Sequence, residues 1–462
     1  MLTNKLSRRE FLRLSAVAGG ATLLAACAPA PATEAPKAVA TPTSAAPSGE
    51  KVKVRWMSRA ADWGGQEATV ALPEMVKTYF NADYPDIEVA VEPAPPEWIE
   101  KLVTAMVAGD AVDVFEAWPD IFHEWVERNL ILDLQPFVDR DLTKETIDDY
   151  IPAQWEALFM NGKRVGLPLY VDMRLETYNK DIFDKYGVSY PPADGNWTVE
   201  DYAAMCTKLT QDTNGDGKID LWGSILETGG WFYWPRMFGG DYVDPNDNTK
   251  CYLDSEGSQA ALNFIWEYQW RKVPNVFAQP AQVENAWYYE AFVPQMVAIA
   301  EKGCYPARTV REIEGKFKWD YAHPPKGPKG HHTLVDSDGW SIWIGSKQAE
   351  AAWKLIKFLS GPKFEEEVIV KVAGAVPVRL SILPNFITIL RDKFPELKDV
   401  RLEVLKEILE EPGYGGNVHW FKKHLKAMEI INPAYDLVFA TGEKDPSYFA
   451  EICKQVNESQ LG

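Results

Sequence analysis

Strand and helix patterns alternate along the first part of the chain, and this alternation limits the fold more than any other feature. Residues 52–57 and 87–91 alternate apolar and polar side chains as strands do, and residues 112–115 continue the pattern as a third strand. The segments between them, residues 67–81 and 98–108, carry apolar side chains at helical spacing. This alternation predicts an α/β fold, with a mostly parallel sheet flanked by helices.

Aromatic and acidic side chains directly follow the predicted strands. Trp63 comes after the first strand, and Trp118 and Asp120 lie in the loop after the third. Ligands of open α/β sheets bind beyond the carboxyl ends of the strands, so these residues are candidates for a binding site. Trp231 and Trp234 lie in the turn-rich run Gly-Gly-Trp-Phe-Tyr-Trp-Pro. Flat indole rings beside polar groups suit the C–H faces and hydroxyl rims of sugars, and packing in the core is the alternative for each ring.

The first 27 residues have the pattern of an export signal with a lipid-attachment site. The run from Ser7 to Leu12 resembles the twin-arginine export signal, and Leu24-Ala25-Ala26-Cys27 resembles the bacterial lipobox. The apolar stretch at residues 14–26 is shorter than the roughly 20 residues that span a membrane, which disfavours a permanent transmembrane anchor. We therefore expect acyl chains on Cys27 to hold the protein at the outer face of the cell membrane.

Composition separates a tether from a folded body. Residues 28–50 are rich in Pro, Ala, Ser and Thr, which predicts an extended linker without a core. The whole chain of 462 residues is long enough for two or three domains. Its formal net charge of −19 disfavours nucleic acids and anionic lipids as partners.

Four cysteines follow Cys27 in the chain. Their spacing matches no zinc or redox motif. One or two disulfides would be compatible with an oxidising compartment, and so would free thiols, and the sequence leaves both open. The four residues are Cys206, Cys251, Cys304 and Cys453.

The rest of the chain continues the alternation and then becomes mainly helical. A buried type of strand at residues 164–171 leads into residues 172–179, and Thr198 with Asp201 has the pattern of a helix N-cap. Helices are predicted at residues 258–270, 349–359, 362–372, 398–409 and 419–430.

Several segments, taken in order, resemble the extracellular solute-binding proteins of ABC importers, the family that includes the maltose-binding and glycerol-phosphate-binding proteins. The similarity extends over roughly residues 52–455. The segments that carry it are residues 112–133, 162–181, 297–303, 338–347 and 349–359.

The resemblance implies two α/β lobes that close on a ligand, with an extended helical C-terminal part. Residues 51–171 and 298–343 would form the N-terminal lobe, and residues 172–297 and 344–462 the C-terminal lobe. The hinges would lie near residues 170–172, 298–303 and 339–344.

The resemblance also implies a function and a set of ligand contacts. The chain would be the substrate-binding component of an ABC importer, a monomer that captures a sugar or oligosaccharide and delivers it to a membrane permease. Where the family often has Gly-Trp, this chain has Gly-Cys-Tyr, so only the Tyr is carried over. The implied contacts are Trp118, Asp120, Tyr170, Asp172, Trp231, Trp234, Tyr305 and Trp340.

A loop in the middle of the chain matches most of an EF-hand calcium site. Oxygen ligands would come from positions 1, 3, 5, 7 and 9, and Gly occupies position 6. Position 12 is Gly223, so the bidentate carboxylate is missing, and a turn held by its own side chains is the alternative. The ligands of a structural Ca²⁺ ion would be Asp212, Asn214, Asp216, Lys218 and Asp220.

Enzymatic readings have weaker support. The sequence holds no nucleophile elbow, P-loop or dinucleotide fingerprint, and His123 and Glu127 form only half of a zincin motif. A secreted glycoside hydrolase would need two nearby carboxylates, which 67 acidic residues leave open. A binding protein for a peptide or a sugar phosphate is a further alternative. We expect a binding protein and not an enzyme.

Overall fold

The computed structural model describes residues 51–226, 233–284, 288–303, 305–410 and 419–461. Cys27, the export signal, the tether, Trp231 and Cys304 lie outside these residues. Within the described residues, no helix combines the length and apolar character that crossing a membrane requires.

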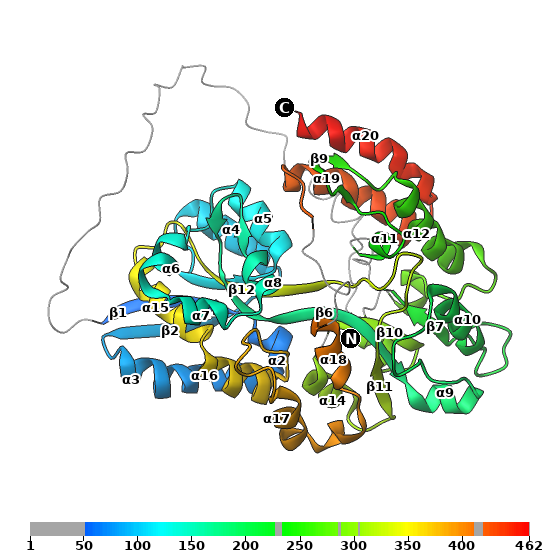
Figure 1. The fold of residues 1–462 in the computed structure, drawn as a ribbon, viewed down its shortest axis with the longest axis horizontal. Helices are drawn as coiled ribbons and strands as arrows, with labels where there is room; N and C mark the ends of the chain where they lie inside the picture. Colours follow the sequence, from blue (N-terminus) through cyan, green and yellow to red (C-terminus); the bar gives the residue numbers. More distant parts are fainter. Residues whose placement is uncertain (1–50, 227–232, 285–287, 304, 411–418, 462) are drawn as a thin grey trace, which may run out of the picture. The chain divides into compact units, whose positions relative to one another are not determined.

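A mixed eight-stranded sheet runs through the described chain (Figure 1). Its strand order is β2-β1-β3-β12-β6-β10-β7, with β11 pairing beside β6. Parallel pairs join β1 to β2, β1 to β3 and β10 to β7, as the alternation predicts. The pairs that involve β12, β11 and the contact of β6 with β10 are antiparallel, so the sheet is mixed where the sequence predicts a mostly parallel one. The strands are β1 (Val52–Ser58), β2 (Ile87–Pro93), β3 (Val114–Ala117), β6 (Leu167–Asn179), β7 (Trp222–Ile225), β10 (Val297–Gly303), β11 (Trp319–Ala322) and β12 (Val335–Ile342).

Strand β6 belongs to both halves of the sheet. From Leu167 to Met173 it pairs with β12, and from Arg174 to Asn179 it pairs with β10 and β11. The change of partner falls one residue after the hinge expected at residues 170–172. Of the thirteen residues of β6, only Asp172 and Arg174 are partly exposed. We call the part around β1, β2, β3 and β12 the first lobe and the part around β7, β10 and β11 the second lobe.

Helices cover both faces of the sheet in the first lobe. Neighbouring strand residues point to opposite faces, and Trp56 and Met57 accordingly belong to different hydrophobic clusters. The Trp56 cluster includes side chains of α2 (Ala60–Met75) and α15 (Ala349–Leu359). The Met57 cluster includes side chains of α4 (Trp98–Ala108) and α5 (Pro119–Glu127). This layering is the α/β architecture that the sequence predicts.

The second lobe has a core of its own, rich in aromatic side chains. Tyr202, Trp234 and Phe277 pack in it together with residues of the surrounding helices. These helices are α9 (Lys180–Tyr186), α10 (Val199–Leu209), α12 (Glu256–Trp266), α19 (His424–Tyr435) and α20 (Phe449–Gln460). The predicted cap of α10 is confirmed, because Thr198 and Asp201 exchange hydrogen bonds as a capping box.

The segment after residue 344 contributes side chains to two hydrophobic clusters, and the expected assignment of residues 344–462 to one lobe stays a prediction. Helix α15, the helical segment Glu365–Ala373 and α18 (Glu403–Glu410) share the Trp56 cluster, which also includes side chains of β7, β10 and β11. Helices α19 and α20 share the core of the second lobe. Helix α15 itself packs against β1, β6 and β12.

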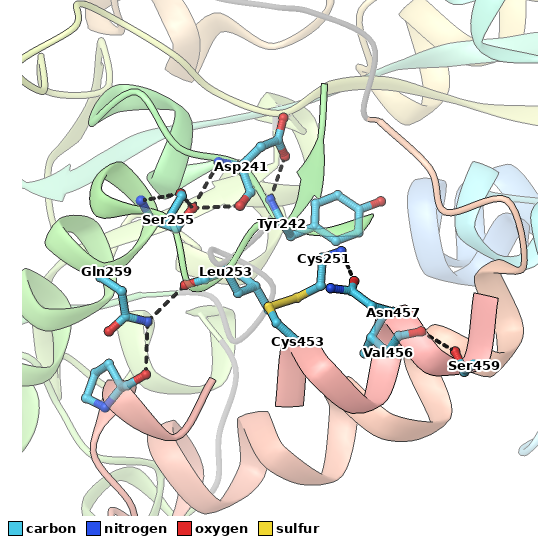
Figure 2. The surroundings of a disulfide bond; sticks show 12 residues. Asp241, Tyr242, Cys251, Leu253, Ser255, Gln259, Cys453, Val456, Asn457 and Ser459 are labelled. Carbon is cyan, nitrogen blue, oxygen red and sulfur yellow. Dashed lines mark hydrogen bonds between the residues drawn. A yellow bond between two sulfur atoms is a disulfide. The ribbon is translucent and has the colours of Figure 1, made fainter. Parts of the chain in front are cut away.

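A disulfide joins Cys251 to Cys453 and so ties the end of β9 (Asp247–Cys251) to α20 (Figure 2). The backbone N–H of Cys251 also donates to Oδ1 of Asn457, at 2.7 Å. Cys206 is a buried free thiol in the described chain. The C-terminal helix is therefore covalently fixed to a strand that precedes it by 202 residues.

Candidate ligand-binding site

A polar and aromatic cluster lies at the carboxyl ends of β1 and β3. Arg59 directly follows β1, Glu116 lies within β3, and Trp118 is the N-cap residue of α5. The Glu116 Oε1 atom accepts the backbone N–H of Arg59 at 2.6 Å and the indole N–H of Trp63 at 2.9 Å. Trp63 is buried in the first turns of α2, before Gly65 (φ 69°) interrupts that helix. The hydrogen bond from Trp63 thus helps to fix the position of the Glu116 carboxyl group.

The Arg59 guanidinium is the centre of the cluster. Its Nη1 atom lies 3.0 Å from Asp338 Oδ2, and the two side chains are only 10% and 7% exposed. The guanidinium also lies over the rings of Trp98 and Trp118, 5.1 and 4.8 Å from their centroids. Burial opposes the charge of Arg59, but the nearby carboxylates, Asp338 foremost, outweigh it and raise its pKa. Arg59 therefore stays positively charged while its guanidinium packs against two indole rings.

Trp98 and Trp118 are the aromatic faces of this cluster. Their rings meet edge to face with centroids 5.7 Å apart, and both side chains are partly exposed. Packing against Arg59 and against each other restricts the rotamers of both rings. Two partly exposed indoles can offer apolar surface to a ligand.

Burial raises the pKa of Glu116 to about 8, against the opposing effects of Arg59 and the Trp63 hydrogen bond. Its second carboxyl oxygen, Oε2, finds no hydrogen-bond partner among the described residues. At a pH below this pKa the Glu116 carboxyl group is protonated, so its burial leaves no unpaired negative charge in the cluster.

The hinge strand adds a second layer to the cluster. The Tyr170 hydroxyl donates to Asp338 Oδ2 at 2.8 Å, and Tyr305 packs edge-on against the Tyr170 ring. The Tyr305 hydroxyl donates to Asp172 Oδ1 at 3.1 Å, and Arg174 Nη1 lies 2.7 Å from Asp172 Oδ2. The structure thus brings Tyr170, Asp172 and Tyr305 together, and their contact with a ligand stays a prediction.

Asp120 of α5 contacts the second lobe. Its Oδ1 atom lies 2.5 Å from Nε2 of His424, the first residue of α19. Glu127, at the other end of α5, accepts the backbone N–H of His424 at 2.5 Å. Asp120 remains about one-third exposed, so its carboxylate is still open to solvent.

Two other predicted residues lie in the cores of the lobes. Trp234 is fully buried and donates its indole N–H to Glu301 Oε1 at 3.1 Å. Trp340 is also fully buried and packs edge-on against Trp56. Neither lies in the Arg59 cluster, and Trp231 is outside the described residues. Direct contact of any predicted residue with a ligand stays a prediction.

Sequence reasoning missed four members of the cluster. Glu116 could have been found, because it is a charged residue at the end of an apolar strand. Arg59 directly follows β1, the position that singled out Trp63. Trp98 and Asp338 join the cluster only through tertiary contacts, and no local pattern marks them.

The predicted calcium loop is held by hydrogen bonds of its own side chains. Asp212 accepts the backbone N–H groups of Gly215 and Gly217 at 2.6 and 2.7 Å, and Asp220 accepts that of Thr213 at 2.8 Å. Within the described part of the chain, no three His, Cys, Asp or Glu side chains gather in a way that could hold a metal ion. Calcium binding therefore stays a prediction.

Residues 64–366 match the bacterial extracellular solute-binding protein family, and the chain belongs to that family. The family consists of extracellular proteins, which places this one outside the cytoplasm. A Brucella abortus protein that carries the name of a binding protein is 26% identical over 293 residues, which cover 62% of this chain and 67% of that protein.

Solved structures share the two-lobed fold. An ABC substrate-binding protein of Listeria monocytogenes, in complex with cycloalternan, superposes with a TM-score of 0.73 at 23% identity, covering 89% of this chain and 98% of that one. The sugar-binding protein MalE of Xanthomonas citri superposes with a TM-score of 0.64 at 22% identity, covering 88% and 97%. The predicted fold class is confirmed.

Proposed function

We propose that this protein captures a carbohydrate outside the cytoplasm and delivers it, as a monomer, to the membrane permease of an ABC importer. The observation that carries the proposal is the pair of partly exposed indoles, Trp98 and Trp118, ordered over Arg59. The Asp120 carboxylate follows Trp118 by two residues and is about one-third exposed, so it can accept hydrogen bonds from sugar hydroxyls. The Listeria and Xanthomonas proteins, which are named for carbohydrate ligands, support the same ligand class.

A glycoside hydrolase would need two carboxyl groups that reach a substrate. Glu176 and Glu301 are paired across β6 and β10, but both are buried, Glu301 at 2% exposure and Glu176 fully. Burial and the charge of Glu301 raise the pKa of Glu176 well above its usual value. This pair is a core feature and does not favour an enzyme.

The attachment to the membrane is part of the proposal. A twin-arginine signal for export and lipidation of Cys27 would leave the folded body on a linker of residues 28–50. The support for this step is the order and spacing of the sequence motifs. A structural Ca²⁺ ion bound by the loop at Asp212 to Asp220 is proposed on the same kind of support.

Calorimetric titration with a panel of sugars tests the main proposal. Substitution of Trp118 or Trp98 by Ala should weaken binding by about 2 kcal/mol or more, because anchor aromatics carry much of the affinity. Trp266 is a matched control, since it is a partly exposed Trp beneath Arg271, at 5.2 Å, on α12. Equal affinities for the parent, Trp118→Ala and Trp98→Ala would contradict the assigned site, and hydrolysis of any sugar would contradict the binding-protein reading.

A further inference from the structure

One face of helix α5, in the first lobe, meets the beginning of helix α19, in the second. Asp120, His123 and Glu127 are spaced by three and four residues, so they lie on the same face of α5. Asp120 and Glu127 contact His424, the first residue of α19. His123 contacts Trp420, four residues before it. We call these contacts the α5–α19 clasp, and they join elements that pack in separate cores.

The N-terminus of α19 takes its cap from the first lobe. Its N-cap residue is Lys423, whose ammonium group cannot accept a hydrogen bond. Glu127 Oε1 accepts the backbone N–H of His424 at 2.5 Å and that of Leu425 at 3.4 Å. A carboxylate at this position satisfies N–H groups that have no acceptor within the helix, and it interacts favourably with the helix dipole. Residues of both lobes therefore build this helix terminus.

Two imidazole rings extend the clasp. His424 Nε2 lies 2.5 Å from Asp120 Oδ1, and the His424 side chain is only 2% exposed. The His123 ring stacks on Trp420, with centroids 4.4 Å apart and an angle of 28°. Burial lowers the pKa of His123 to about 3, so this ring is neutral at physiological pH and packs as an aromatic surface. The clasp thus combines polar and aromatic contacts.

The beginning of α19 is anchored within the second lobe. The backbone N–H of Lys423 donates to Gln460 Oε1 of α20 at 2.8 Å, and Gln460 Nε2 donates to the Lys423 carbonyl at 3.1 Å. The disulfide between Cys251 and Cys453 joins α20 to β9 in turn (Figure 2). The first turn of α19 therefore moves with the second lobe, and separation of the lobes would break its contacts with α5.

The carboxylates of the clasp are open to water. Glu127 is exposed and Asp120 is about one-third exposed, so water can replace the hydrogen bonds that they accept. Exchange of a protein partner for water makes the net contribution of each such hydrogen bond small. The clasp therefore favours contact between the lobes without making it permanent. Strand β6 is different, because its backbone joins the lobes covalently.

We propose that the α5–α19 clasp is a latch that holds the two lobes together when no ligand is bound. The proposal does not rest on the proposed function, since each contact of the clasp joins one part of the chain to another. Its consequence is energetic. A ligand that binds between lobes already in contact supplies less of the free energy of closure, so its apparent affinity is higher.

Small-angle X-ray scattering of the purified protein, without any sugar, tests the latch. Glu127→Ala removes the cap of α19 at an exposed position, so the variant should fold and have a larger radius of gyration than the parent. Asp120→Ala combined with Glu127→Ala should increase the radius further. Glu124→Ala is the matched control, because Glu124 of the same helix pairs with Arg128 at 3.0 Å and should leave the radius unchanged.

Hydrogen exchange followed by mass spectrometry distinguishes opening of the lobes from unfolding. In Glu127→Ala the amides of His424 and Leu425 should exchange about threefold faster or more, because they lose their acceptor. The amides of β3 and β7, one strand from each lobe, should exchange as in the parent. Faster exchange of these strands would show that the clasp stabilises the fold and not the contact between the lobes, and would overturn the proposal.

The scattering outcomes are equally decisive. Equal radii for the parent, Glu127→Ala and the double variant would overturn the latch, and so would an equal increase in Glu124→Ala. These measurements use no ligand. A parent protein that binds no sugar would therefore contradict the proposed function and leave the latch standing.

Discussion

Arg59 and Asp338 form a buried ion pair at 3.0 Å, although 279 positions separate them in the sequence. Asp338 lies on β12, which also pairs with the hinge strand β6, so this contact ties the end of β1 to the hinge. A buried charge without its partner is costly, so the pair is a sensitive point of the first lobe.

Asp338→Asn should lower the free energy of unfolding by about 3 kcal/mol, because it removes the buried carboxylate that pairs with Arg59 and leaves only Asp62 among the described residues, at 3.2 Å and 56% exposed, as a counterion. Urea denaturation followed by Trp fluorescence measures the change. The control is Glu350→Gln, which removes an exposed partner of Arg140 at 2.8 Å and should cost below about 1 kcal/mol. If both variants lowered the free energy of unfolding by similar amounts, the buried pair would contribute no more to stability than the exposed one.

Glu116→Gln should flatten the dependence of stability on pH. The pKa of Glu116 is raised in the folded state from 4.5 to about 8, so its contribution is complete below 4.5 and is lost as the pH rises toward 8. The Gln variant cannot ionise and should lose less stability over that range than the parent. Denaturation curves at several pH values test this, and parallel curves for the two proteins would contradict it.

Removing the disulfide should destabilise the second lobe. Cys251→Ser combined with Cys453→Ser should lower the free energy of unfolding by about 2–5 kcal/mol, because the unfolded chain regains the freedom of a long closed loop. Thermal melting of the parent with and without a reductant should show a lower Tm after reduction. The double variant is the control, and its Tm should not respond to the reductant.

Cys27→Ser should release the protein from the membrane fraction, because the acyl chains have no other attachment in the proposed scheme. Fractionation of cells and labelling with a fatty acid measure the effect. Cys206→Ser is the control and should stay membrane-bound and labelled. A membrane-bound, unlabelled Cys27→Ser protein would instead indicate a transmembrane anchor.

Calcium at millimolar concentration should raise the Tm of the parent if the loop at residues 212–220 binds it, since a ligand of the folded state stabilises that state. Asp216→Asn should abolish the shift. Asp194→Asn is a matched control, because Asp194 also accepts a nearby backbone N–H, from Asn196 at 3.0 Å, outside the loop. Equal shifts for the parent and Asp216→Asn would place calcium elsewhere.

Features that depend on local pattern were predictable from the sequence. Helix α4 has the predicted bounds, and the Thr198 cap of α10 forms as its spacing indicates. Trp118 and Asp120 are candidates because ligand-facing residues of α/β sheets follow strands, and their contact with a ligand stays a prediction. The fold class follows from the same alternation.

Features that depend on distant contacts were not predictable. Nothing near Arg59 in the sequence indicates that Asp338 lies beside it. Trp340 lies within β12 and Trp118 directly follows β3. Only tertiary packing decides that Trp340 is buried in the core and Trp118 is partly exposed. The pairing of Cys251 with Cys453 was one of several combinations that four cysteines allow.

Strand β6 limits the kind of movement that the lobes can make. Its backbone is hydrogen bonded to β12 on one side of Met173 and to β10 on the other side of Arg174. Pulling the lobes apart along this strand would break those ladders, whereas a change of twist at the junction would preserve them. Asp172 and Arg174 lie on either side of Met173 and form an ion pair. A solute that binds Asp172 would therefore contact the part of β6 at which the strand changes its partners.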